Sequence, residues 1–229
     1  MNQKGEKRII IGITGASGAI YAVRTVRALV LAGFEVHLVV SHFGERLLAE
    51  EAGVKLAKDG FDPIIAEALA RSRMAQDSKL DSSGGGHPPA IHTSGQNVGS
   101  IVRHGIMDLG ASIASGSFQA RGMIVVPCTT KSLAGIANGL SGTLIERAAD
   151  VCLKERRPVA LVVREAPLSL IHLRNMVAAA EAGATIIPAS PAFYQKPANF
   201  DDLGDFIAGR ALSILGIEHR LFPAWMEED

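Results

Sequence analysis

Short apolar runs alternate along the chain with longer segments whose apolar positions recur every three to four residues. The first run, Arg8–Ile13, is rich in β-branched residues, leads into a glycine-rich turn, and is followed by an apolar-periodic segment from 22 to 31. This order predicts a buried strand, a tight turn and a helix. The same reasoning predicts four further strands, at Glu35–Val40, Gly122–Pro127, Val159–Val163 and Thr185–Ile187.

Helical segments fill the intervals between these strands, and another closes the chain at 199–215. The alternation predicts an α/β fold in which a doubly wound parallel sheet forms a Rossmann-like or flavodoxin-like three-layer sandwich. We expect residues 1–229 to form a single domain. Because right-handed crossovers return the chain to the same sheet edge, polar residues that follow the strands should gather in one crevice.

The regular pattern is lost between residues 54 and 100. A helix is predicted at 64–74, but the composition of 81–89 is typical of a solvated loop. His87, His92 and His104 lie in or near this segment, and their spacing matches no metal-ligand motif. We therefore interpret 54–100 as a partly flexible surface insertion and expect no metal site there.

Composition excludes several classes of function. Apolar residues make up 48% of the chain, and 23 basic residues balance 23 acidic ones, so no net field would attract nucleic acid. No apolar run is long enough to cross a membrane, and the N-terminal residues lack a signal-peptide pattern. Cys128 and Cys152 cannot form a disulfide framework. These features predict a cytoplasmic protein.

Polar groups follow three of the predicted strands. Ser17 lies in the first turn, whose unpaired amides and helix dipole we expect to bind a phosphate. Residues 129–132 follow the third strand, and Arg164 and Glu165 follow the fourth. A phosphate-directed role explains Arg164 better than a structural pair with Glu165. Cys128 has no histidine paired to it by motif, and we interpret it as a small buried hydrophobe.

A dinucleotide-binding dehydrogenase is a weak alternative. The turn resembles that of short-chain dehydrogenases, which need a tyrosine with a lysine four residues later. Tyr21 and Tyr194 are followed at that spacing by Thr25 and Ala198. Ser41 stands where an acidic residue would bind the adenine ribose.

Several motifs together resemble the UbiX-type flavin prenyltransferases. They are Gly15-Ala16-Ser17-Gly18, Ser115-Gly116-Ser117, 127–132, 144–158 with 163–167, and Pro191-Ala192-Phe193-Tyr194. The resemblance implies a metal-independent enzyme that joins a dimethylallyl group from dimethylallyl phosphate to N5 and C6 of reduced FMN. The product, prenylated FMN, would serve a UbiD-type decarboxylase. The resemblance also implies a homo-oligomer, with a dodecamer among the sizes it allows.

The resemblance assigns roles residue by residue. A basic clamp of Lys154, Arg164 and Arg210 would stabilise the departing phosphate, and Tyr194 and Arg210 would come from a neighbouring subunit. Leu109 departs from the tryptophan with which some members line the prenyl pocket. The implied FMN-binding residues are Gly15, Ala16, Ser17, Ser41, Thr129, Thr130, Lys131, Ser132 and Arg164; the implied prenyl-donor residues are Lys154, Glu165, Tyr194 and Arg210; the implied catalytic residues are Ser17, Glu51, Glu165 and Lys154.

Two other functions stay open. A flavin-dependent cysteine decarboxylase of the related homo-oligomeric flavoproteins would use a histidine base, and His42 lies near the expected place. The Asn-rich Met motif of those enzymes is not found. A non-catalytic flavin-storage protein is the other alternative.

Overall fold

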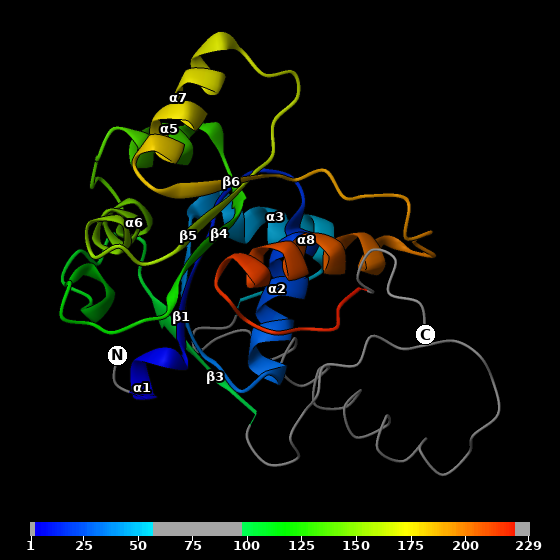
Figure 1. The fold of residues 1–229 in the computed structure, drawn as a ribbon, viewed down its shortest axis with the longest axis horizontal. Coiled ribbons are helices and arrows are strands. Elements are labelled where there is room, and N and C mark those ends of the chain that lie inside the picture. The colour runs from blue at the N-terminus through cyan, green and yellow to red at the C-terminus, as the bar shows by residue number, and fades with distance from the viewer. Residues whose placement is uncertain (1–2, 57–97, 223–229) are drawn as a thin grey trace.

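The computed structural model describes residues 3–56 and 98–222 (Figure 1). In this part of the chain six parallel strands form one sheet in the order β3-β2-β1-β4-β5-β6. The order reverses between β1 and β4, and this reversal opens a crevice at the carboxyl ends of the strands. The strands are β1 (Arg8–Ile13), β2 (Glu35–Val40), β3 (Ser100–His104), β4 (Gly122–Cys128), β5 (Val159–Val163) and β6 (Ala184–Pro188).

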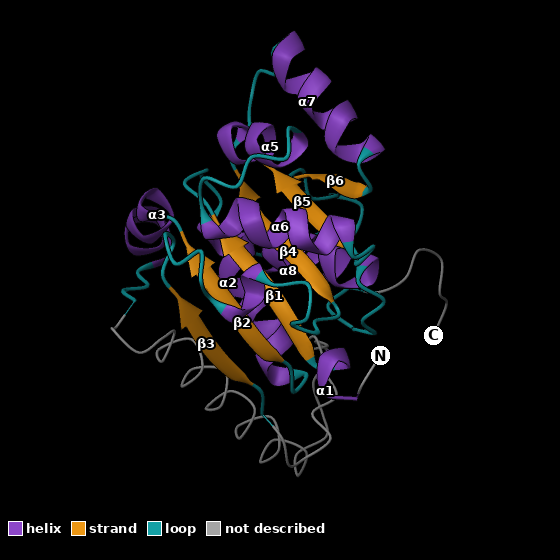
Figure 2. Ribbon diagram, turned by 90° about the vertical axis from the view of Figure 1, so that its left-hand side faces the viewer, coloured by secondary structure: helices purple, strands orange, loops and turns teal. Residues whose placement is uncertain are grey.

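Helices cover both faces of the sheet, as Figure 2 shows. Ile9, Ile11 and Ile13 of β1 point into a core under α2 and α8, whereas Ile10 joins a second core under α5, α6 and α7. The three-layer α/β sandwich is therefore confirmed. The helices are α1 (Gln3–Glu6), α2 (Ala19–Leu31), α3 (His42–Ala52), α5 (Thr130–Ala137), α6 (Leu144–Lys154), α7 (Leu170–Glu181) and α8 (Phe200–Ile214), with a 3₁₀ turn, η2, at Ser112–Ala114.

Strand β3 is the main feature that the sequence reasoning missed. Among the described residues it pairs only with β2, at the edge of the sheet, and its short sequence mixes Ile101 and Val102 with Arg103 and His104. An edge strand of this kind has no continuous apolar run to reveal it. The predicted helix at 64–74 and loop at 81–89 lie outside the described residues.

An ion pair locks α8 onto α2. The Arg24 guanidinium donates to Asp205 at 2.6 Å, and both side chains are almost fully buried. Burial raises the pKa of Asp205, and the neighbouring Arg24 charge opposes that rise. This pair fixes the helix that carries Arg210.

In the part of the chain that the structure describes, no helix is long and apolar enough to cross a bilayer.

Candidate functional site

Three strand ends are connected directly at the carboxyl edge of the sheet. The Arg164 side chain, which follows β5, donates from Nε to the Ser17 carbonyl at 3.1 Å. Its backbone amide donates to the Cys128 carbonyl at 3.3 Å, at the end of β4. The turns after β1, β4 and β5 thus form one continuous surface, as the crossover argument predicted.

Two hydroxyl groups in this crevice cap helices. Ser41 Oγ accepts the Gly44 amide at 3.1 Å at the start of α3, and Thr129 Oγ1 accepts the Ser132 amide at 3.2 Å at the start of α5. The side chain of Lys131 is exposed on the first turn of α5. Two helix N-termini therefore lie at the edge of the crevice, an arrangement that favours a phosphate or another anion.

Glu51 caps the third helix N-terminus from 33 residues away. Its carboxylate accepts the amides of Gly18 at 2.8 Å and Ala19 at 2.9 Å, because Gly18, the residue at the cap of α2, has no side chain to do so. The expectation that this turn presents unpaired amides is therefore wrong for these two groups. These contacts join Glu51 to the turn after β1, so it is not an isolated surface carboxylate.

The same contacts keep Glu51 ionised. Partial burial acts to raise its pKa, but hydrogen bonds from the Ala19 and Gly18 amides and the Ser17 hydroxyl, together with the Arg164 charge, bring the pKa below its ordinary value. At neutral pH this carboxylate can accept a proton rather than donate one.

Tyr21 is a site neighbour that the sequence reasoning did not select. Gly18 has a positive φ of 112°, and a Cβ there would lie 2.7 Å from the Tyr21 ring. Burial raises the pKa of the Tyr21 hydroxyl, and the charge of Arg164 opposes that rise. A tyrosine in the first turn of an amphipathic helix carries no sequence signal of this position. Gly15 is also constrained, because a Cβ there would overlap Phe43.

Lys154 lies near the amino ends of the strands, opposite the end at which the crevice opens. It ends α6 and precedes β5, whereas Arg164 follows β5, and five strand residues at roughly 3.3 Å each place the two ends about 16 Å apart. Lys154 pairs with Glu155 at 2.6 Å beside Gly116 of the Ser115–Ser117 loop. In one chain Lys154 and Arg164 therefore lie at opposite ends of β5, and the clamp that they are expected to form with Arg210 stays a prediction.

Tyr194 and Arg210 belong to the α8 side of the molecule. The Tyr194 ring contacts Phe206 of α8 edge-on, with centroids 6.3 Å apart, and Arg210 follows one turn later. Both side chains are exposed. A Cβ on Gly122, at the start of β4, would contact Leu215 just after α8, so this helix runs back toward the amino edge of the sheet.

Cys128 is fully buried, and burial raises its pKa to about 12. A thiol with that pKa is not a nucleophile at neutral pH. The interpretation of Cys128 as a small buried hydrophobe is confirmed. Glu165, next to Arg164, is exposed and accepts the Ala166 amide at 3.0 Å.

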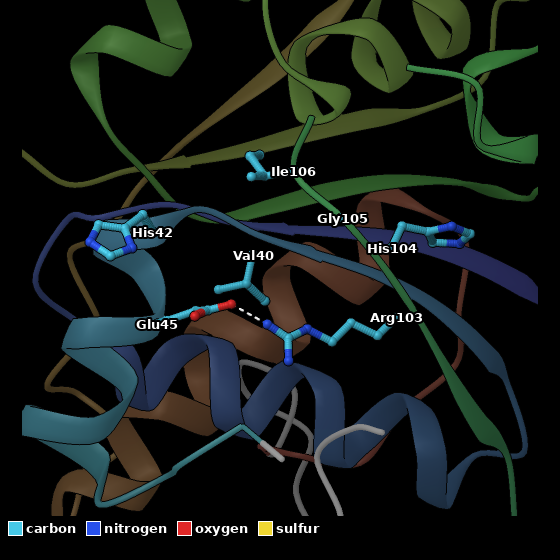
Figure 3. Close-up of a pocket in the computed structure, with 7 residues that line it drawn as sticks. All are labelled: Val40, His42, Glu45, Arg103, His104, Gly105 and Ile106. Atoms are coloured by element: carbon cyan, nitrogen blue, oxygen red, sulfur yellow. Dashed lines mark hydrogen bonds and ion pairs between the residues drawn. The ribbon is translucent and has the colours of Figure 1, made fainter. Parts of the chain in front are cut away.

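A pocket of about 400 Å³ adjoins Ser41 beyond the ends of β2 and β3 (Figure 3). Glu45 of α3 and Arg103 of β3 point toward each other across it and form an ion pair. The sequence reasoning missed this pocket because it missed β3. The lining residues are Val40, His42, Glu45, Arg103, His104, Gly105 and Ile106.

Taken together, the fold and the crevice define a doubly wound α/β protein whose topological switch point presents donors suited to a phosphorylated ligand. The Flavoprotein family profile matches residues 1–212. A flavin prenyltransferase UbiX of Halalkalibacterium halodurans is 44% identical over 218 residues, which are 95% of this chain and 93% of that protein. The chain therefore belongs to the flavoprotein family and, within it, to the UbiX flavin prenyltransferases.

Solved structures agree with this assignment. The crystal structure of AnUbiX (PadA1) in complex with FMN and dimethylallyl pyrophosphate has a TM-score of 0.74 and 36% identity, and the match covers 98% of this chain and 100% of that one. A dodecameric FMN-dependent UbiX-like decarboxylase from Escherichia coli O157:H7 has a TM-score of 0.72 and 33% identity, with 96% and 99% of the two chains covered. The cysteine decarboxylase TvaF is 12% identical and shares the fold alone.

Proposed function

We propose that this protein joins the dimethylallyl group of dimethylallyl phosphate to N5 and C6 of reduced FMN and releases phosphate. The single observation that carries the proposal is the connection of Ser17 and Arg164 across the switch point, beside two capped helix N-termini. Membership of the UbiX family indicates the reaction, and the crevice contains the anion-binding groups that such a reaction needs.

The residues at the strand ends fit FMN. Hydroxyl groups, backbone amides and the Arg164 guanidinium form a donor set suited to a phosphate and to a ring with carbonyl and nitrogen acceptors. Reduced FMN, when bound, supplies the two ring atoms that accept the dimethylallyl group. We assign its binding to Gly15, Ala16, Ser17, Ser41, Thr129, Thr130, Lys131, Ser132 and Arg164.

The side chains around this site stabilise charge and transfer protons during the proposed reaction. As the carbon–oxygen bond of the prenyl phosphate breaks, Arg164 offsets the charge of the departing phosphate, and Glu165 supplies or relays a proton to it. Formation of the second bond joins the tertiary prenyl carbon to C6: the adjacent alkene carbon takes up a proton, and C6 releases one. Glu51 accepts that proton, with Ser17 as its hydrogen-bonding neighbour, because its lowered pKa keeps it ionised at neutral pH.

The site is completed by neighbouring copies of the chain. Lys154 precedes β5 whereas Arg164 follows it, so we infer that Lys154 reaches a prenyl phosphate in the Arg164 crevice across a subunit boundary. The resemblance gives the same origin to Tyr194 and Arg210. Helix α7 provides a surface for such contacts: its side chains are mostly exposed, including Leu170 at 60% and Ile171 at 69% exposure. An apolar helix face of this kind is typical of an interface between subunits.

The test is the mass of the flavin. The purified protein is incubated anaerobically with reduced FMN and dimethylallyl phosphate, and the released flavin is analysed by mass spectrometry, with dimethylallyl pyrophosphate in a parallel reaction. We expect a flavin heavier by one prenyl group with the monophosphate. An unchanged flavin mass overturns the proposal. Glu165→Gln and Lys154→Ala should still bind FMN but fail to prenylate it.

The proposed product, prenylated FMN, would pass to a UbiD-type decarboxylase in the cytoplasm. Addition of the wild-type reaction mixture to such a decarboxylase prepared without cofactor should restore decarboxylation. A mixture made without the prenyl donor should not.

A further inference from the structure

Thr14 connects β1 to β4 at the point where their ladder ends. The last paired residues of the two strands are Gly12 and Val125, and beyond Val125 the pairing of β4 with β5 also changes register. Pro127 has no amide hydrogen with which to continue the ladder. At this gap the Thr14 hydroxyl donates to the Pro127 carbonyl at 2.8 Å and accepts the Thr129 amide at 2.8 Å.

In these two hydrogen bonds the Thr14 hydroxyl group acts once as a donor and once as an acceptor. The Thr14 amide also donates to the Pro127 carbonyl, at 3.2 Å, so the Thr14 residue makes three contacts with the segment 127–129. Thr14 is only 3% exposed and has no access to a ligand in the crevice. Whatever it contributes to the site must act through the residues next to it.

Those neighbours are the two ligand-binding turns. Thr14 immediately precedes Gly15–Ser17, and its partner Thr129 begins the turn 129–132 and caps α5. We propose that Thr14 is a positioning residue for FMN: it holds the turn after β1 and the turn after β4 in the register that the cofactor requires. This inference rests on the proposed function, which assigns both turns to FMN.

The decisive variant is Thr14→Val, which keeps the shape of the side chain and removes both hydroxyl bonds. Thr14→Ser keeps the hydroxyl. The matched control is Thr25→Val, because Thr25 is also fully buried and its hydroxyl donates to the Tyr21 carbonyl at 2.7 Å, inside α2. For each protein we would measure the Kd for oxidised FMN by calorimetry, the visible circular dichroism of the bound flavin, and the midpoint of urea unfolding.

We expect Thr14→Val to weaken FMN binding about five- to tenfold, the factor that one net hydrogen bond represents, and to change the dichroism of bound flavin. Thr14→Ser should stay within about threefold of the wild-type Kd, since it retains both bonds. Thr25→Val should shift the unfolding midpoint and leave the Kd unchanged.

Three results would overturn the inference: a wild-type Kd for Thr14→Val, an equal loss of FMN affinity in Thr25→Val, or no rescue by Thr14→Ser. If Thr14→Val does not fold, the Kd values of Thr14→Ala and Thr14→Ser for FMN are compared instead, and they decide the question in the same way. A wild-type protein that binds FMN without prenylating it overturns the proposed function alone, because the effect of Thr14 is read from binding. A wild-type protein that does not bind FMN overturns both.

Discussion

The carboxylate of Glu51 accepts the backbone amide of Gly18 at 2.8 Å, and this contact brings the last turn of α3 to the first turn of α2. In the glycine-rich turns that bind phosphates, such amides are the usual ligands of the anion. Here a side chain of the protein takes that place on α2. The amides of Gly18 and Ala19 are therefore already occupied, and the other donors at the crevice are the N-termini of α3 and α5 and Arg164.

We predict that Glu51→Gln slows prenyl transfer by about 100-fold or more, the usual contribution of a positioned proton acceptor. The amide side chain can still accept the Gly18 hydrogen bond, so the Kd for FMN should change by less than about threefold. Single-turnover mass spectrometry of the flavin measures the rate. The control is Glu50→Gln, since Glu50 is exposed and pairs with Arg46 on the outer side of α3. Equal rates for the two variants would contradict the role of Glu51.

We predict that Ile171→Lys disrupts the assembly. Ile171 is 69% exposed in the single chain, and burial of such a side chain at an interface contributes about 1.5–3 kcal/mol, whereas a buried unpaired ammonium opposes association. Analytical ultracentrifugation should show a smaller species than the wild type and, with it, loss of prenylation. Val98→Lys, at an exposed valine beyond the opposite edge of the sheet, is the control. A variant of unchanged size would contradict the role of α7 as an interface.

The sequence patterns predicted five of the six strands that the structure describes and the edge of the sheet at which their polar ends meet. They succeeded because buried parallel strands such as β4 and β5 are continuous apolar runs, and because strand ends must meet at one edge. They failed for β3, whose polar residues belong to an edge strand. The hydrogen bond between Glu51 and Gly18 could not be predicted from the sequence either, because it depends on how α3 packs beside α2. The separation of Lys154 from Arg164 follows from β5 itself, and it could have been predicted from the strand length.

Acid should destabilise the fold through His37 and His104. His37 Nδ1 lies 2.9 Å from His104 Nε2, and His37 Nε2 lies 2.8 Å from Glu35, which also pairs with Arg8. Burial lowers the pKa of both histidines; the His37 charge adds to this at His104, while Glu35 opposes the shift at His37 and Asp108 opposes it at His104.

The lowered pKa values of His37 and His104 determine how the stability of the fold depends on pH. The unfolded histidines take up protons as the pH falls through about 6.5, before the folded ones do, so stability is fully present above that pH and declines below it. The slope is at most about 1.4 kcal/mol per pH unit for each histidine. Urea unfolding measured from pH 8 to pH 5 tests this decline, and the His37→Gln/His104→Gln double variant should show a shallower one. A stability that is constant over this range in the wild type would contradict the prediction.

The position of Lys154 predicts that two inactive variants restore activity when they are mixed. If Lys154 of one chain serves the crevice that holds Arg164 of another, Lys154→Ala and Arg164→Ala each leave every site defective. In oligomers formed from equal amounts of both, about a quarter of the sites combine an intact Arg164 with an intact Lys154, because each residue comes from the required chain half of the time. Prenylation should then recover to about a quarter of the wild-type rate. The control mixes Lys154→Ala with the Lys154→Ala/Arg164→Ala double variant, which offers no intact Lys154 and should stay inactive. Absence of recovery in the first mixture, with mixed oligomers demonstrated by two affinity tags, would mean that Lys154 does not act on a neighbour's crevice, and the shared site would have to be abandoned.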